Sequence, residues 1–377
     1  MRRRTPNSAI KFLILTDTHF GVHFANKPRS KRKFALGNQF FDQAEKIFKL
    51  AIEKHEVDFV LHCGDFFNRS KPHPSIIAKA TSLLLWIAKY VPVYIIPGNH
   101  ERSKLPIGLL HYQKNIHVFT KPCSFHYRKK NEVVKITGIP YNRHNIKLEF
   151  KALVKEAWNT EINSTKIKPT YNILLLHQLI QGSKVEHYTF NQGNNVINFF
   201  DIPKRFHLIA VGHVHRFQFL YSLHGRIYSS HTNRRVIQDI IHNEWKFFNE
   251  PRVANNHFPI ICYPGSCERV SMMESNENKG YTIGCINHSA SKATLEFHPI
   301  KSIPMMKIKL KISDMNVENL IYQTNKKIHH LTTLSCLKEL GGVLRITSSD
   351  SINPITLTHV KDYAKKKKVI LKLPHSR

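Results

Sequence analysis

Short apolar runs alternate with stretches of helical periodicity over the first hundred residues. Residues 11–15 ("KFLIL") form an apolar run of strand length, and residues 38–57 then repeat apolar side chains at helical spacing. The alternation continues with an apolar run at 58–63, a helical pattern from Pro74 to Ala88 and a third run at 92–97. This order predicts a largely parallel sheet with helices against its faces. In such sheets ligands bind beyond the carboxyl ends of the strands.

The later part of the chain has a different pattern. Three segments favour hairpins: 117–140, 257–266 and 280–286. From Lys301 the order strand, helix, strand, helix, strand extends over roughly 75 residues, which is enough for a small domain. We therefore predict a main domain over residues 1–300 and a small α/β domain over residues 301–377.

The composition is that of a globular protein without a membrane span. The chain has 377 residues, of which 41% are hydrophobic and 22% are charged. No run approaches the ~20 apolar residues that a membrane-spanning helix needs. The N-terminal apolar run leads directly into "TDTH" with no small-residue cleavage site, and the six cysteines form no Cys-x-x-Cys pair. These features favour a cytoplasmic protein with reduced thiols.

The net charge changes this picture most. The chain carries 57 basic and 26 acidic side chains, a formal net charge of +31. Such an excess indicates a polyanionic partner, nucleic acid first and an anionic membrane surface second. A compositional bias in a chain rich in Asn and Ile is the alternative explanation. That bias would not deplete the acidic residues or cluster the basic ones at Arg2–Arg4 and 29–33, so we favour nucleic acid.

Polar residues with metal-binding side chains follow five of the predicted strands. The oxygen and nitrogen donors among them suit Mn²⁺, Fe²⁺ or Zn²⁺. Each has a plain structural alternative when taken singly, such as a helix cap, a turn or a core histidine. Their joint occurrence at strand ends instead predicts a metal site, made by Asp17 and His19, Asp65, Asn99 and His100, His177, and His213 and His215.

The order of these motifs resembles that of the calcineurin-like metallophosphoesterase family. That family has the motifs D-x-H, G-D, G-N-H-[DE], H and G-H-x-H, and its fold is a β-sandwich flanked by helices. The segments "DTHFG", "GDFFNRSKP", "IPGNHERS", "HQLIQG", "GHVH" and "YPGSCER" further resemble the SbcD-type DNA repair exonucleases. The resemblance covers about residues 8–300, and the part after residue 301 more loosely resembles their capping domain. It implies an α/β fold with a sandwich rather than a single open sheet.

The resemblance also implies a role for each motif residue. One metal would be held by Asp17, His19, Asp65 and His215, and the other by Asp65, Asn99, His177 and His213, with Mn²⁺ as the expected ion. Two ions roughly 3.5 to 4 Å apart can bind a phosphodiester and activate a water molecule. His100 would stabilise the transition state or protonate the leaving oxygen; a supporting contact to a ligand is its alternative role.

Two motif positions depart from the family pattern. Asn68 stands where many relatives have a carboxylate, so the sequence leaves open which group orients His100. Glu101 replaces the commoner Asp, which is a mild change.

The implied function is a manganese-dependent DNA nuclease of the SbcD type. A metallophosphatase or phosphodiesterase acting on a nucleotide or another small phosphoester is the alternative, because the metal centre is common to the whole family. A DNA-binding scaffold with an inactive site is disfavoured, because no ligand is missing. The implied partners are DNA, a second copy of the chain and an SbcC-like ATPase. Family members often continue into helices that dock on the ATPase, whereas this sequence ends at Arg377, which weighs against that partner.

A basic loop is expected close to the metal site. The segment "KPRSKRK" (27–33) begins eight residues after His19 and contains Arg29, Lys31, Arg32 and Lys33. Four cations this close repel one another in a core, so we expect an exposed loop. A merely solvated loop is one interpretation, and contact with DNA phosphates is the one that we favour.

We predict that replacing Lys31, Arg32 and Lys33 with Ser weakens binding equally across DNA sequences. Each lost phosphate contact releases fewer counterions, so the slope of log K against log salt should flatten by about two to three units. Hydrolysis of a small phosphodiester should be nearly unchanged. Fluorescence anisotropy of labelled duplexes over a salt series measures the slope, and a triple variant with the parent slope would refute the DNA contact.

Overall fold

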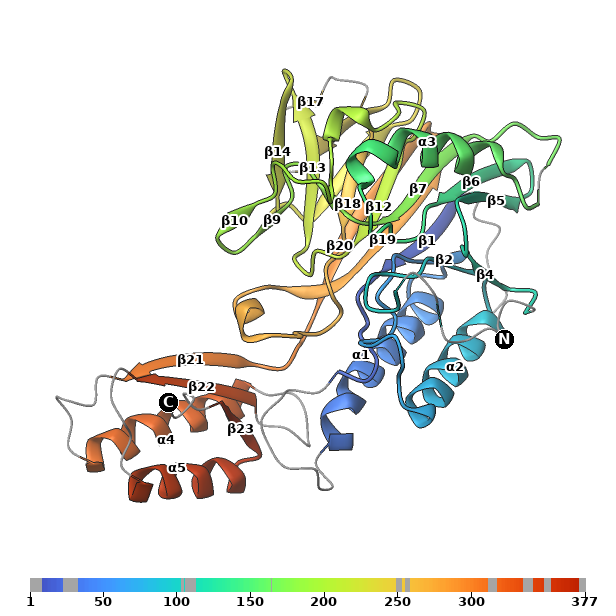
Figure 1. Ribbon diagram of the computed structural model, residues 1–377. Helices are drawn as coiled ribbons and strands as arrows, with labels where there is room; N and C mark the ends of the chain where they lie inside the picture. The colour runs from blue at the N-terminus through green and yellow to red at the C-terminus, as the bar shows by residue number, and fades with distance from the viewer. Residues whose placement is uncertain are drawn as a thin grey trace. The chain divides into compact units, whose positions relative to one another are not determined.

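The computed structural model describes residues 9–22, 33–102, 105, 113–163, 165–248, 253–254, 258–310, 317–334, 342–348 and 354–372. Two compact units emerge (Figure 1). Unit 1 comprises residues 1–22, 37–267 and 279–300, and unit 2 comprises residues 23–36, 268–278 and 301–377. The division into a nuclease domain over 1–300 and a capping domain over 301–377 stays a prediction about function.

Unit 1 contains two large sheets. The first has nine strands in the order β17-β16-β15-β20-β19-β1-β2-β3-β4, in which β1 to β4 are parallel and β19 is antiparallel to β1. Its strands are β1 (Ile10–Leu15), β2 (Phe59–His62), β3 (Val93–Ile95), β4 (Ile116–Val118), β15 (Arg235–Asp239), β16 (Glu244–Phe247), β17 (Val253–Ala254), β19 (Lys279–Asn287) and β20 (Lys292–Ile300).

The second sheet has seven strands in the order β14-β13-β18-β12-β7-β6-β5, with β6, β7, β12 and β18 parallel. Its strands are β5 (Cys123–Lys129), β6 (Glu132–Gly138), β7 (Tyr171–His177), β12 (Leu208–Gly212), β13 (Gln218–Leu223), β14 (Arg226–Ser230) and β18 (Ile260–Tyr263). Short pairs and one 3₁₀ turn lie outside it: β8 (Leu179–Ile180) with β11 (Val196–Ile197), β9 (Lys184–Val185) with β10 (Tyr188–Thr189), and η2 (Phe199–Asp201).

The main core lies between these two sheets. Alternate residues of β1, namely Ile10, Phe12 and Ile14, belong to one buried cluster with Ile173 and Leu175 of β7. Since strands alternate their side chains between two faces, each sheet buries one face against the other. The predicted β-sandwich is therefore confirmed, and the parallel order expected from the first hundred residues holds for β1 to β4 within a mixed sheet.

Three helices cover the outer faces. Helices α1 (Lys33–Glu53) and α2 (Pro74–Ala88) lie beside β1 and β2 in Figure 1, and the ring of Phe41 on α1 stacks on that of Phe20 with centroids 4.2 Å apart. Helix α3 (Ile146–Asn159) buries Ile146, Phe150 and Val154 with the outward side chains of β7 and β12. Sequence periodicity predicted α1 and α2 but had not identified α3.

Unit 2 has its own small core. Its parallel strands β21 (Met305–Leu310), β22 (Gly342–Ser348) and β23 (Val369–Lys372) alternate with α4 (Val317–Leu334) and α5 (Pro354–Lys366). Leu331 of α4 and Val360 of α5 pack with Leu344 and Ile346 of β22. The unit also holds η3 (Met272–Glu274). The element order is the one that the sequence predicted after Lys301.

Candidate metal centre

All seven predicted ligands, and His100, follow strands whose carboxyl ends meet at one edge of unit 1. Strands β1, β2 and β3 are parallel neighbours in the first sheet, and β7 and β12 are parallel neighbours in the second. Three groups of donor atoms lie within 4.8 Å of one another: Asp17, His19 and His215; His19, Asp65 and His100; and Asp17, Asp65 and His177. Asp65 and Asp17 each occur in two groups, so the ligands form one continuous site.

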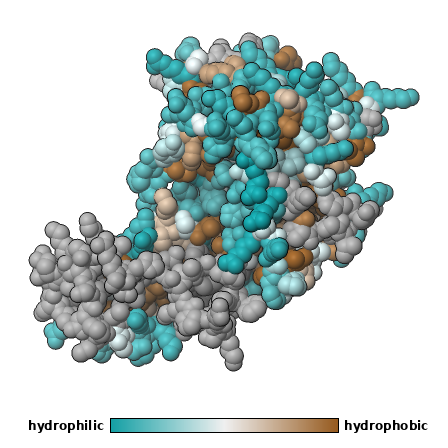
Figure 2. All heavy atoms as spheres, viewed as in Figure 1, coloured by the Kyte–Doolittle hydropathy of each residue, from teal (hydrophilic) through white to brown (hydrophobic). Residues whose placement is uncertain are grey.

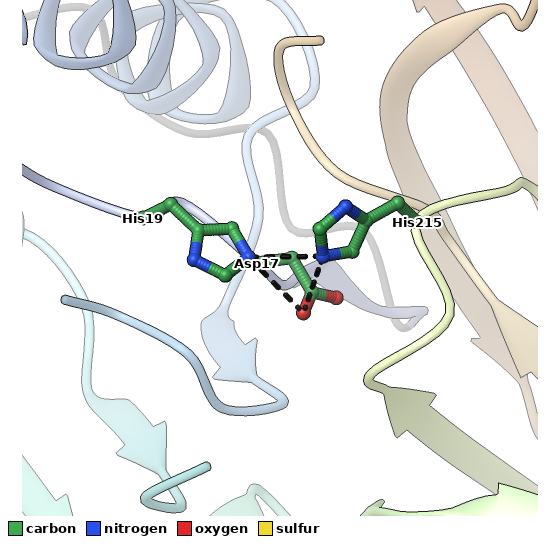
Figure 3. A group of neighbouring side chains, drawn as sticks. All are labelled: Asp17, His19 and His215. Carbon is green, nitrogen blue, oxygen red and sulfur yellow. Dashed lines mark hydrogen bonds and ion pairs between the residues drawn. The ribbon is translucent and has the colours of Figure 1, made fainter. Parts of the chain in front are cut away.

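Figure 3 shows the group formed by Asp17, His19 and His215. The Nε2 atoms of His19 and His215 lie 2.9 Å apart, and Asp17 Oδ1 lies 3.8 Å from His19 Nε2 and 3.6 Å from His215 Nε2. Asp17 and His19 are fully buried, whereas the His215 side chain is 23% exposed. The group is thus open to solvent on the side of His215.

The donors around His177 and Asn99 show how well the site fits a cation. His177 Nδ1 lies 2.7 Å from the Cys63 carbonyl oxygen. That oxygen can only accept, so the proton is on Nδ1 and the Nε2 lone pair faces inward. There Nε2 meets Asn99 Oδ1 at 3.0 Å and Asp65 Oδ2 at 3.4 Å, and His213 Nδ1 lies 2.7 Å from the same Asn99 oxygen. Converging acceptors with a backbone bond behind the histidine are the arrangement of a divalent metal site.

The electrostatics of the protein alone express the same need for positive charge. Burial disfavours the imidazolium form of His177, but the Asp65 carboxylate favours it more strongly and raises the pKa of His177 to about 9. Burial opposes ionisation of Asp65 too, yet His177, His19 and His100 hold the pKa of its carboxyl well below the usual range. Burial lowers the pKa of His213 to about 3, so that ring is neutral and able to act as a ligand.

His100 is oriented by a main-chain atom. Its Nδ1 donates to the carbonyl oxygen of Asn68 at 2.8 Å, and its backbone N–H donates to Asp65 Oδ1 at 2.9 Å. The Nε2 atom lies 3.7 Å from Asp65 Oδ2, and the side chain is 37% exposed. The group that orients His100, which the sequence left open, is therefore the backbone of Asn68 rather than its side chain.

Four site residues have a left-handed backbone. The φ angles are 50° for Asp17, 44° for His19, 50° for Asp65 and 84° for His213. Such angles cost about 1 to 2 kcal/mol per residue for side chains with a Cβ, although Asp tolerates them better than most. Loop hydrogen bonds hold them: Asp17 N–H to Gly64 O and His19 N–H to Asp65 O, both at 3.0 Å, and His213 N–H to Asp17 Oδ2 at 3.2 Å. Strain of this kind is typical of functional sites.

Two motif glycines make room for His177. Gly64 has a φ of +95°, and a Cβ there would collide with the His177 ring. A Cβ on Gly212 would collide with the Cys63 carbonyl oxygen, the Thr16 hydroxyl and the same ring. The glycines of the G-D and G-H-x-H motifs are thus required by close packing around one ligand.

Glu101 ties two ligand-bearing loops together. It is 1% exposed, and its two carboxylate oxygens accept from the N–H groups of Phe67 at 2.6 Å and Gly98 at 2.7 Å. Burial, with Asp65 nearby, raises the pKa of Glu101 to about 8, and the two N–H donors oppose that rise. The side chain thereby fixes the loop of Asp65 against the loop of Asn99 and His100.

Two further residues at the site were missed by sequence reasoning. Lys279 is buried, and its ammonium donates to the His215 carbonyl oxygen at 2.8 Å. Tyr141 lies with its ring centroid 6.1 Å from that of His177 and 5.9 Å from that of His213. Tyr141 follows β6, which is parallel to β7, so its position after a predicted strand was the available signal.

The predicted basic loop lies outside the described residues. Arg29, Lys31 and Arg32 fall in the undescribed range 23–32, and Lys33 begins α1, with a side chain that also lies outside the described part. Their contact with DNA stays a prediction.

Comparison with known proteins adds a family and several relatives. The model of the family described as calcineurin-like phosphoesterase matches residues 10–217. Over 214 residues the chain is 28% identical to the DNA double-strand break repair protein Mre11 of Methanococcus maripaludis, an alignment covering 55% of this chain and 52% of that protein. Over 322 residues it is 23% identical to the protein of the same name from Thermoplasma acidophilum, covering 82% of this chain and 72% of that protein.

The chain therefore spans about half the length of the first of these relatives. Among solved structures, purple acid phosphatase PPD1 from yellow lupin (Lupinus luteus) seeds aligns with a TM-score of 0.41 and 12% identity, over 74% of this chain and 49% of that one. A likeness of this degree carries no argument about activity.

We predict that Glu101→Gln weakens divalent metal binding by about 10- to 100-fold, the range for residues that support ligands. The single amide oxygen of Gln can accept only one of the two N–H groups, and its NH₂ would face the other donor. Isothermal titration with Mn²⁺ measures the loss. Glu156→Gln, an exposed position on α3, is the control and should bind as the parent does. Equal affinity for Glu101→Gln and the parent would contradict the tying role.

Proposed function

The chain belongs to the calcineurin-like phosphoesterase family, and on that premise we propose that it is a manganese-dependent nuclease that hydrolyses DNA phosphodiesters. The observation that carries the proposal is the convergence of seven potential ligands and His100 at the strand ends of unit 1. A metallophosphoesterase acting on a small phosphoester would use the same ligands. The choice of DNA therefore needs separate support.

The donor set fits two ions that share Asp65. Asp17, His19, Asp65 and His215 would hold one ion, and Asp65, Asn99, His177 and His213 the other. When bound, such ions supply Lewis-acid charge to a phosphoryl oxygen and lower the pKa of water. The chain's own part is to orient the ligands: the Cys63 carbonyl fixes the His177 ring, and the Asp17 carboxylate accepts from the His213 N–H.

His100 would handle a proton during the reaction. With Nδ1 committed to the Asn68 carbonyl, only Nε2 is directed toward Asp65 and the ligand groups. An imidazolium at this partly exposed position donates from Nε2, which suits protonation of a leaving alkoxide or stabilisation of the crowded phosphoryl group.

DNA is favoured by charge and by the relatives. A net charge of +31 suits a polyanion, and two relatives carry the name DNA double-strand break repair protein. Figure 2 shows hydrophilic residues over most of the visible described surface. Among the described residues no helix is long and apolar enough to cross a membrane.

We further propose a cytoplasmic location and two protein partners: a second copy of the chain and an SbcC-like ATPase. The ATPase comes from the motif resemblance alone. Size-exclusion chromatography with light scattering tests the dimer.

The direct test incubates the purified protein and Mn²⁺ with end-labelled single- and double-stranded DNA beside a small phosphodiester. We expect DNA cleavage that excess chelator abolishes and that Mn²⁺ restores better than Mg²⁺. Histidine-rich sites hold Mn²⁺ more readily, since Mg²⁺ prefers oxygen ligands and keeps its waters. Full activity in excess chelator would exclude the metal mechanism, and cleavage of the small ester alone would favour the alternative phosphodiesterase.

His100→Ala should retain both metals and DNA affinity but lose about 10²- to 10⁴-fold in cleavage rate, the range for a lost general acid. Asp65→Ala is the contrasting variant, which should lose metal because Asp65 faces donors from both groups. Elemental analysis and single-turnover kinetics separate the two effects. A metal-free His100→Ala protein would show that His100 is a ligand or its support.

A further inference from the structure

Tyr141 is held rigidly at the edge of the metal centre. Its backbone N–H donates to the Pro97 carbonyl oxygen at 3.2 Å, one residue before the loop of Asn99 and His100. The carbonyl of the next residue, Asn142, accepts from the Gln178 amide at 2.9 Å, one residue after His177. The position of Tyr141 is therefore coupled to both loops that carry the Asn99 and His177 ligands.

The Tyr141 ring forms a wall beside two of those ligands. It is tilted by 35° to the His213 ring and lies nearly perpendicular, at 78°, to the His177 ring. His177 is fully buried, whereas Tyr141 keeps intermediate exposure. An aromatic face that stays accessible about 6 Å from the ligand rings is available to a substrate group attached to a phosphate at the site.

We propose that Tyr141 forms a nucleoside subsite, in which its ring stacks on the base joined to the phosphate that is cleaved. The inference rests on the function proposed above and makes it more specific, since it names a nucleoside as the group recognised beside the phosphate. Aromatic side chains stack on any base, because every base has a π face. The subsite would favour nucleotide esters over small phosphoesters without reading sequence.

Two other roles for Tyr141 give different results. If the ring only supports the histidines by packing, its removal would weaken metal binding and harm every substrate equally. If the hydroxyl contacts the phosphate, Phe would be as damaging as Ala. A stacking ring instead makes Phe a near-neutral replacement and confines the loss with Ala to substrates that carry a base.

A matched pair of chromogenic esters separates these roles. Thymidine 5′-(p-nitrophenyl phosphate) carries a base, and methyl p-nitrophenyl phosphate has the same leaving group without one. Tyr141→Ala should lower kcat/KM for the thymidine ester on the order of 5- to 150-fold, with the methyl ester within about twofold of the parent. Tyr141→Phe should resemble the parent on both. Tyr228→Ala, which removes another partly exposed tyrosine on β14, is the control and should leave the ratio of the two rates unchanged.

Binding gives a readout that does not depend on turnover. Calorimetry in Mn²⁺ should show weaker thymidine 5′-monophosphate binding for Tyr141→Ala, with inorganic phosphate binding and metal content as in the parent. Equal losses on both esters, a loss of metal, a Tyr141→Phe defect matching that of Ala, or no change at all would each overturn the subsite. A parent protein that cleaves neither ester would instead refute the proposed function, and the binding comparison would still decide the subsite.

Discussion

Acceptor atoms that face one another without a donor between them are the constraint on which the rest of this structure depends. Around Asn99 Oδ1, the inward lone pair of His177 and the oxygens of Asp65 approach within 3.0 to 3.4 Å of a neighbouring acceptor in a buried setting. Such an arrangement is costly unless a positive charge enters it. The raised pKa of His177 is the protein's own partial answer, because a proton there supplies some of that charge. Two cations would supply more.

The sandwich exists in a form that can maintain this arrangement. Asp17 and His213 are far apart in the sequence and come from different sheets, yet the carboxylate of one accepts from the backbone N–H of the other. Each sheet contributes parallel strands whose ends meet at the same edge, so the contact needs no long excursion of the chain. The buried cluster between the sheets, to which Phe12 and Ile173 belong, fixes the spacing of these edges. Packing of the core and position of the ligands are therefore one problem.

Sequence reasoning found what depends on residue type and periodicity. The alternation of apolar runs located β1, β2 and α2, and the residue types after the strands identified the ligands. It could not find what depends on backbone geometry, such as the positive φ of Asp17 and His19, because no side-chain pattern encodes it. Helix α3 was missed although Ile146, Phe150 and Val154 have helical spacing, since the lysines and glutamates between them weaken the apolar pattern. Glu101 was identified as a motif variant, but its bonds to Phe67 and Gly98 join segments that only the fold brings together.

The bond from His100 to the main chain of Asn68 has an evolutionary consequence. Every residue type has a carbonyl oxygen, so a substitution at position 68 that preserves the loop also preserves the acceptor for Nδ1. The orientation of His100 is then insulated from mutation at the one neighbouring position where the sequence departs from the carboxylate of many relatives. Position 68 can drift, and the side chain there is available to acquire a new role while the proton-handling histidine keeps its tautomer.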